Sequence, residues 1–169
     1  MLRRLDYVLE PTKQKVLDYL PKTKGLSPTA VEEVLKRQAK LSFYNKSKFD
    51  FQKLIADPND IAANLKNYIN GFSKNARTIL ERFNFNDHIE RLDKANLLYK
   101  VIKRFAEIDL HPDKISNIEM GYIFEELIRK FADLSNETAG EHFTPREVIR
   151  LMVNILFFFS IVLLKRSPF

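Results

Sequence analysis

The sequence predicts an all-α fold, an irregular bundle of several helices, and three observations lead to this prediction. Apolar residues recur at helical spacing through most of the 169 residues, and no segment alternates strictly enough to form a strand. Glycine accounts for only 4 residues, against an average usage of roughly 7%. Tight β-hairpins and glycine-rich cofactor loops are therefore disfavoured. Hydrophobic residues at 45% and charged residues at 30% are typical of a folded globular domain.

Proline and capping residues divide the first half of the chain into helices. A helical segment over residues 2–9 is expected to be interrupted by Pro11, and a second helix should cover 12–20. Ser27-Pro28 combines an N-cap with proline at the first helical position, which predicts a helix to about Leu41. Asp57-Pro58 repeats that pattern. The remaining elements expected here are a loop over 42–51, helices over about 51–56 and from Asp57 to near Gly71, and a short helix over 75–83.

The second half predicts fewer and longer helices. The longest should run from Asp87 to Ile108, and His111-Pro112-Asp113 should end it. Ser116-x-x-Glu119 is a capping box that opens the next helix. On that helix we expect Gly121, Phe124, Leu127, Ile128, Phe131 and Leu134 to face inwards, and Glu125–Arg129 and Glu126–Lys130 to form exposed ion pairs.

A last helix is predicted to begin at Thr144-Pro145-Arg146-Glu147 and to continue into an apolar run over 151–164. That run is shorter than the roughly 18 residues a membrane span needs, so we expect no membrane insertion. Such a run is more typical of a buried helix or of one covered by a partner, and it could support self-association.

The net charge of +6 is concentrated at one end of the chain. Residues 1–84 carry 16 Lys and Arg against 9 Asp and Glu, whereas residues 85–169 carry 12 against 13. A basic half is compatible with binding the phosphates of DNA, through Lys46 and Lys48 of the aromatic loop in particular. A solvated, lysine-rich surface is the simpler alternative.

Several kinds of chemistry have no support in the sequence. There is no cysteine, and none of the three histidines has a second histidine at ligand spacing, so no metal site is assigned. No G-x-S-x-G, P-loop or G-x-G motif is present, so we assign no catalytic residue. Glu125 and Glu126 could be paired acid–base carboxylates, but basic residues four positions later favour surface ion pairs.

One segment, residues 137–147, joins a polar loop to a helix with its own capping box, Thr144-x-x-Glu147. A helix N-terminus has free N–H groups that favour an anion such as a carboxylate or phosphate. A well-capped helix with no ligand is the alternative reading, and the residues alone favour it.

The same segment carries a resemblance to a known family. Residues 118–131 and 135–153, with Leu2-Arg3-Arg4-Leu5-Asp6, Phe43-Tyr44-Asn45, Ile69-Asn70-Gly71-Phe72 and Ala106-Glu107-Ile108-Asp109-Leu110, resemble the modification (M) subunit of type I restriction–modification systems. The resemblance implies the amino-terminal helical domain of an S-adenosylmethionine-dependent N6-adenine DNA methyltransferase. It also implies a cytoplasmic complex, in a bacterium or archaeon, of DNA, a specificity subunit, a second M subunit and a restriction subunit.

In that family the first cofactor-contacting motif occupies the position of residues 140–146 here. The resemblance therefore implies that S-adenosylmethionine is contacted by Glu141, His142, Phe143, Thr144, Pro145 and Arg146. The family's later G-x-G and Asn-Pro-Pro-aromatic motifs are absent, since no two prolines are adjacent. Because the second of these motifs holds the flipped adenine, we expect no methyl transfer by this chain alone. A helical module that only binds DNA or assembles with other subunits is the alternative function.

The resemblance also predicts a domain organisation. It covers about residues 2–156, which we assign to the helical domain, and the domain is expected to be incomplete at its start. Residues 157–169 depart from the family pattern, and we interpret them as a divergent apolar tail produced by a frameshift or truncation.

Overall fold

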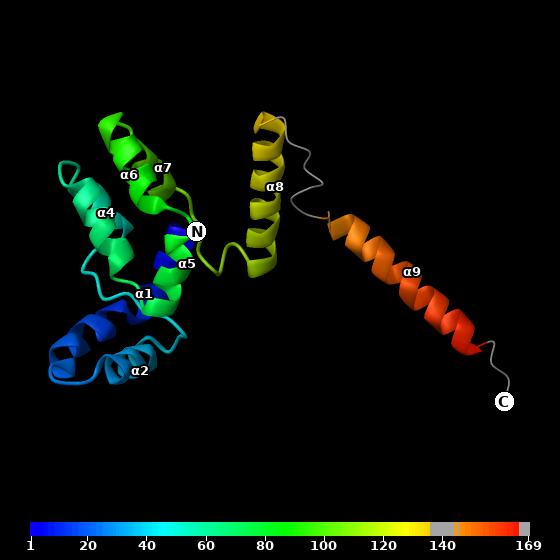
Figure 1. The fold of residues 1–169 in the computed structure, drawn as a ribbon, viewed down its shortest axis with the longest axis horizontal. Helices are drawn as coiled ribbons and strands as arrows, with labels where there is room; N and C mark the ends of the chain where they lie inside the picture. Colours follow the sequence, from blue (N-terminus) through cyan, green and yellow to red (C-terminus); the bar gives the residue numbers. More distant parts are fainter. Residues whose placement is uncertain (136–143, 145, 166–169) are drawn as a thin grey trace. The chain divides into compact units, whose positions relative to one another are not determined.

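The computed structural model describes residues 1–135, 144 and 146–165, and their side chains except those of 132–135 and 159–165. The chain forms two compact units, Met1–Ile115 and Ser116–Phe169, which are described separately (Figure 1). Every regular element in the described ranges is a helix, and the β-type contact found among them is one isolated antiparallel bridge between Asn45 and Phe72. The predicted all-α fold is confirmed.

The first unit consists of helices of 6 to 18 residues and one four-residue 3-10 turn. Their bounds are α1 (Leu2–Tyr19), the 3-10 turn η1 (Leu20–Thr23), α2 (Pro28–Ala39), α3 (Phe51–Ala56), α4 (Ile61–Asn70), α5 (Lys74–Glu81), α6 (Phe85–Lys94) and α7 (Leu98–Ala106). The second unit contains α8 (Asn117–Ser135) and α9 (Arg146–Lys165).

Pro11 does not interrupt α1, so the prediction of two separate helices was wrong. A proline inside a helix removes one backbone hydrogen bond and costs about 3 kcal/mol. In α1 the buried positions continue at helical spacing on both sides of Pro11, with Leu9 and Val16 each only 1% exposed, while Pro11 itself is exposed. Packing along this face stabilises the continuous helix despite the proline.

The predicted long helix over 87–108 is instead two helices, α6 and α7. Asn96 adopts a left-handed conformation with φ of 54°. The N–H of Leu97 donates to the carbonyl of Leu92 at 2.9 Å. The N–H of Asn96 donates to the carbonyl of Asp93, also at 2.9 Å. This pair of bonds around a left-handed residue is the Schellman helix stop, and asparagine tolerates the left-handed conformation better than most residues. Apolar spacing that continued past residue 96 concealed the stop.

Two other predicted boundaries need correction. The helix predicted from Asp57-Pro58 begins at Ile61, and the Asp57 carboxylate accepts a hydrogen bond from the side-chain amide of Asn64 at 3.0 Å. The helix predicted to reach Leu41 ends at Ala39, because Lys40 is left-handed with φ of 53°. The cap at Ser27 is confirmed, since its hydroxyl accepts from the Ala30 N–H at 3.3 Å.

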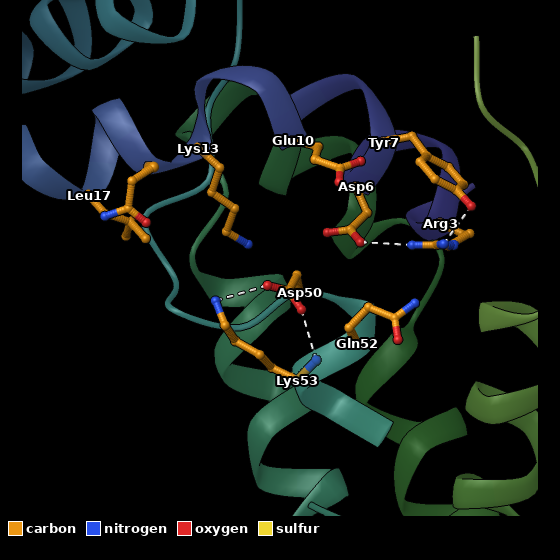
Figure 2. A pocket seen from close by; sticks show the side chains of 10 residues that line it. Arg3, Asp6, Tyr7, Glu10, Lys13, Leu17, Asp50, Gln52 and Lys53 are labelled. Atoms are coloured by element: carbon orange, nitrogen blue, oxygen red, sulfur yellow. Dashed lines mark hydrogen bonds and ion pairs between the residues drawn. The ribbon is translucent and has the colours of Figure 1, made fainter. Parts of the chain in front are cut away.

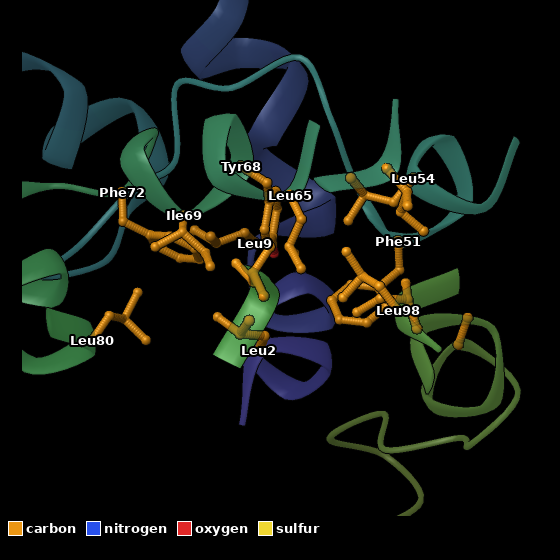
Figure 3. Close-up of a cluster of buried hydrophobic side chains, with 14 residues drawn as sticks. Leu2, Leu9, Phe51, Leu54, Leu65, Tyr68, Ile69, Phe72, Leu80 and Leu98 are labelled. Carbon is orange, nitrogen blue, oxygen red and sulfur yellow. The ribbon is translucent and has the colours of Figure 1, made fainter. Parts of the chain in front are cut away.

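The main core of the first unit lies where α1 meets α3, α4 and the later helices (Figure 3). Tyr68 is fully buried at its centre, and its ring meets those of Phe51 and Phe72 edge to face, with centroids 6.1 and 5.3 Å apart. A smaller cluster joins Val16 of α1 to α2. Because α1 contributes to both clusters, it holds the first unit together.

In the second unit the predicted capping box is confirmed. The Ser116 hydroxyl accepts from the Glu119 N–H at 3.2 Å, and the Glu119 carboxylate accepts from the Ser116 N–H at 2.7 Å. The predicted ion pairs have other partners: Glu126 pairs with Arg129 at 2.6 Å, and Glu125 pairs with Arg146 of α9.

The large apolar side chains that are described on the α8 face predicted to point inwards are exposed within this unit, and the side chain of Leu134 lies outside the described residues. Phe124, Leu127 and Ile128 are 41–43% exposed and Phe131 is 65% exposed. The prediction of a buried face was wrong because two helices offer too little surface to cover an apolar stripe. The apolar residues of α9 from Leu151 to Phe158 are exposed as well. None of the described helices is both long enough and apolar enough to cross a membrane.

Candidate functional site

The loop that carries Lys46 and Lys48 is held firmly against the end of α4. The Lys46 N–H donates to the carbonyl of Gly71 at 2.8 Å, and the Ser73 N–H donates to the carbonyl of Tyr44 at 3.0 Å. The side-chain amide of Asn45 donates to the carbonyl of Tyr68 at 2.9 Å. These long-range bonds fix the backbone of a segment that has no regular secondary structure of its own.

Gly71 makes this close approach possible. A Cβ at this position would lie 2.7 Å from the backbone nitrogen of Ser47 and 2.5 Å from the side-chain oxygen of Asn45. Backbone atoms cannot move aside as the end of a flexible side chain can, so any larger residue would displace the loop.

Burial alternates along the anchored loop. Asn45 and Ser47 are 1% and 5% exposed, whereas Lys46 and Lys48 both point into solvent. The ammonium of Lys48 lies 5.1 Å from the centre of the Phe49 ring. Two lysines displayed two residues apart on a fixed backbone can bind neighbouring phosphates without a further cost for ordering the backbone. The two lysines that were predicted, from charge and aromatic content, to contact DNA are thus both exposed on the same anchored loop.

A polar pocket of about 460 Å³ lies between α1 and the start of α3 (Figure 2). Its wall includes Asp6, which is 7% exposed. The Asp6 carboxylate accepts from the Arg3 guanidinium at 3.2 Å, from the Phe51 N–H at 3.1 Å and from the Tyr68 hydroxyl at 3.1 Å. The Arg3 guanidinium also lies 3.8 Å from the centre of the Tyr7 ring. This network links α1 to α3 and α4.

Lys13 and Asp50 occupy the other side of this pocket (Figure 2). Lys13 donates to the Phe49 carbonyl and lies 4.9 Å from the centre of the Tyr68 ring. Burial lowers the pKa of Lys13, although the nearby Asp6 and Asp50 oppose that shift. Burial, followed by the negative charge of Asp6, raises the pKa of Tyr68.

Arg3 pairs with Asp6 and Lys53 pairs with Asp50 in this pocket, which is typical of a structural network. Sequence reasoning missed it. The spacing of Arg3, Asp6 and Lys13 on one face of a helix is the signal that could have pointed to it.

The predicted cofactor segment is described only in part. Glu141, His142, Phe143 and Pro145 lie outside the described residues, Thr144 is exposed, and Arg146 is the first residue of α9. The Arg146 guanidinium donates from Nε to the Glu125 carboxylate and lies 4.8 Å from the centre of the Tyr122 ring. Its hydrogen bond to Glu125 raises the pKa of Arg146 above its ordinary value.

Within the described residues no three His, Asp or Glu side chains are grouped closely enough to hold a metal ion. His111 instead meets the Tyr7 ring edge to face at 5.3 Å, and its Nδ1 accepts from the Asp113 N–H at 3.2 Å.

Two family models match this chain, one after the other. Residues 1–105 match the family model of the HsdM N-terminal domain, and residues 116–163 match that of the N-6 DNA methylase family. The type I restriction enzyme EcoEI methylase subunit of Escherichia coli is 34% identical over 95 residues, which make up 56% of this chain and 19% of that protein. The chain thus spans about a fifth of the length of this curated relative. No solved structure gives a significant match.

The two family matches divide the chain where the two compact units divide, between residues 105 and 116. The first match covers well over half of the 169 residues. The chain therefore belongs to the HsdM N-terminal domain family and corresponds to the amino-terminal part of a type I restriction–modification methylase subunit.

Proposed function

We propose that this chain is a helical component of an S-adenosylmethionine-dependent N6-adenine DNA methylase and does not transfer methyl groups by itself. The observation that supports this most directly is the succession of the two family matches along one chain. The sequence contains neither a G-x-G motif nor adjacent prolines, so it lacks the groups that would complete the cofactor loop and hold the adenine.

The cofactor part of the proposal concerns the start of α9. S-adenosylmethionine supplies a methyl group on a sulfonium and, at the far end of its methionine portion, a carboxylate. The free N–H groups of the first turn of α9 and the exposed Thr144 hydroxyl are donors suited to that carboxylate. Glu141, His142, Phe143 and Pro145 complete the proposed contacts, as the resemblance implies.

The partner part of the proposal concerns the remaining subunits. We infer that the chain works in a cytoplasmic complex with a specificity subunit, a second methylase subunit and a restriction subunit. The charge of its first 84 residues, 16 Lys and Arg against 9 Asp and Glu, supports DNA as a further partner. The domain boundary near residue 156, followed by a divergent tail, stays a prediction.

Titration with S-adenosylmethionine tests the cofactor part. We expect weak binding by the isolated chain, because only one of the family's cofactor motifs is present. Tight binding accompanied by methyl transfer to DNA would contradict the proposal.

Salt-dependent DNA binding tests the role of the anchored loop. The double variant Lys46→Glu, Lys48→Glu should bind all DNA sequences more weakly and reduce the slope of log K against log [salt] by about 2. The matched control is Lys22→Glu, Lys24→Glu, which changes two exposed lysines with the same spacing elsewhere in the unit. Equal losses in both variants would mean that overall charge, not the loop, determines binding.

A second candidate function, an assembly module without a cofactor, is favoured by one observation. Leu156, Phe157 and Phe158 of α9 are 65–67% exposed, and large exposed apolar patches are uncommon on monomers. Sedimentation should then show self-association through the 151–164 segment. A monomer at all concentrations would remove this candidate.

A further inference from the structure

Two side chains of α8 contact Arg146, the first residue of α9. Glu125 accepts a hydrogen bond from Nε of Arg146, and the Tyr122 ring lies against the same guanidinium, 4.8 Å from its carbon. The side chains of Arg146 and Glu125 are 37% and 28% exposed, so the pair is partly shielded from water. The contact combines a charge-assisted hydrogen bond with cation–π stacking.

Gly121 provides the space for this contact. A Cβ at residue 121 would overlap the terminal guanidinium nitrogen of Arg146. Glycine inside a helix is intrinsically unfavourable compared with alanine. A methyl group here would therefore push the flexible guanidinium end of Arg146 away from the position in which it contacts Glu125 and Tyr122.

The contact anchors α9 to the body of α8. Glu125 precedes the last residue of α8, Ser135, by ten positions, which corresponds to about 15 Å along a helix axis. The start of α9 therefore contacts α8 near the middle of that helix and not at its end. The Arg146 guanidinium is occupied by Glu125 and Tyr122, so it is engaged with the protein itself.

We propose that Gly121, Tyr122 and Glu125 form an arginine clamp that positions Arg146, and with it the first turn of α9, for binding the carboxylate of S-adenosylmethionine. Within the predicted cofactor segment Arg146 is thus a positioning residue, and Thr144 and the helix N–H groups are the direct donors. This inference rests on the proposed function.

The Arg146 Nε–H signal in the NMR spectrum of the full chain tests the clamp directly. Glu125→Gln should shift this signal and speed its exchange with water at least several-fold, because a charged acceptor is replaced by a neutral one. Glu126→Gln is the matched control, since Glu126 accepts from Arg129 Nε at 3.0 Å on the same helix. It should move the Arg129 signal and leave that of Arg146 unchanged. An Arg146 signal that is equally unaffected by both variants would overturn the clamp.

Gly121→Ala separates positioning from structural support. Alanine favours the helix, so the melting temperature and helical content of this variant should be unchanged or higher. The added methyl group should nevertheless displace Arg146 and move its Nε–H signal as Glu125→Gln does. An unmoved signal in Gly121→Ala would contradict the close approach.

Equilibrium binding of S-adenosylmethionine tests the purpose of the clamp. Glu125→Gln and Gly121→Ala should both weaken binding at least several-fold, whereas Glu126→Gln should not. Unchanged affinity in both clamp variants, with a displaced Arg146 signal, would overturn the positioning role. If the unmutated chain binds no S-adenosylmethionine at all, the proposed function and the positioning role both fail. The NMR measurement then still decides whether α8 holds Arg146.

Discussion

Replacing Asp6 by alanine should be among the most damaging single substitutions in the first unit. The side chains of Asp6 and Arg3 are 9% and 8% exposed, so their ion pair is buried. Asp6→Ala would leave the Arg3 guanidinium without its carboxylate and would remove the acceptor of the Phe51 N–H and the Tyr68 hydroxyl. All three donors come from elements that meet in the main core.

The expected loss follows from these three contacts. Removing one partner of a buried ion pair costs about 3–5 kcal/mol, and each neutral donor left unsatisfied costs about 1–3 kcal/mol. The terms overlap, and Arg3 retains a hydrogen bond to the Tyr7 hydroxyl at 2.5 Å. We therefore expect the free energy of unfolding to fall by about 4 kcal/mol, a value within the range for the ion pair alone and below the simple sum of the three costs.

Urea unfolding followed by circular dichroism measures this loss. With a slope of about 2 kcal/mol per molar urea, Asp6→Ala should lower the midpoint by roughly 2 M. Asp60→Ala is the control, because Asp60 is exposed and its side chain makes no cap bond. It should change stability by less than about 0.5 kcal/mol. Equal midpoints for the two variants would refute the assignment of Asp6 as the central acceptor.

Three further predictions can be checked with the same unfolding assay. Gly71→Ala should cost about 1–3 kcal/mol, since its methyl group would meet the backbone of Ser47; an unchanged midpoint would show that the loop gives way freely. Asn96→Val should cost about 1–2 kcal/mol, because a β-branched residue resists the left-handed stop between α6 and α7, and no loss would mean that the stop is unimportant. Burial opposes ionisation of Asp50, but hydrogen bonds from the Lys53 N–H and ammonium outweigh it and lower its pKa. Its contribution is then present above the unfolded pKa of about 3.9 and lost as the pH falls through the folded value. The difference between wild type and Asp50→Asn should therefore shrink at acid pH, and a difference that is constant with pH would contradict this.

The elements that could be predicted from sequence are those specified by local chemistry. Ser27 and the Ser116–Glu119 box each place an acceptor three residues from a free N–H, and both of these predicted caps are formed. The errors arose where distant contacts or backbone conformation decided. Pro11 remains helical because Leu9 and Val16 are buried on either side of it, and no local rule contains that information.

The candidate sites likewise contain features that local sequence predicts and features that depend on distant contacts. Exposure of Lys46 and Lys48 followed from their charge, but the anchor at Gly71 depends on a contact between segments about 25 residues apart. The bond between Asp6 and Tyr68 spans 62 residues, and the clamp between Glu125 and Arg146 spans 21. Glu125 was expected to pair within its own helix, because helical spacing alone reveals only partners three or four residues away.

Methyl transfer by the isolated chain is the measurement that tests the central claim most directly. The chain would be incubated with S-adenosylmethionine labelled on its methyl group and with adenine-containing DNA, beside a complete adenine methyltransferase as the positive control. We predict that no label reaches the DNA, because the groups that hold the target adenine are absent from the sequence. Label on the N6 atom of adenine would contradict the interpretation of this chain as a component that needs the rest of a methylase to act.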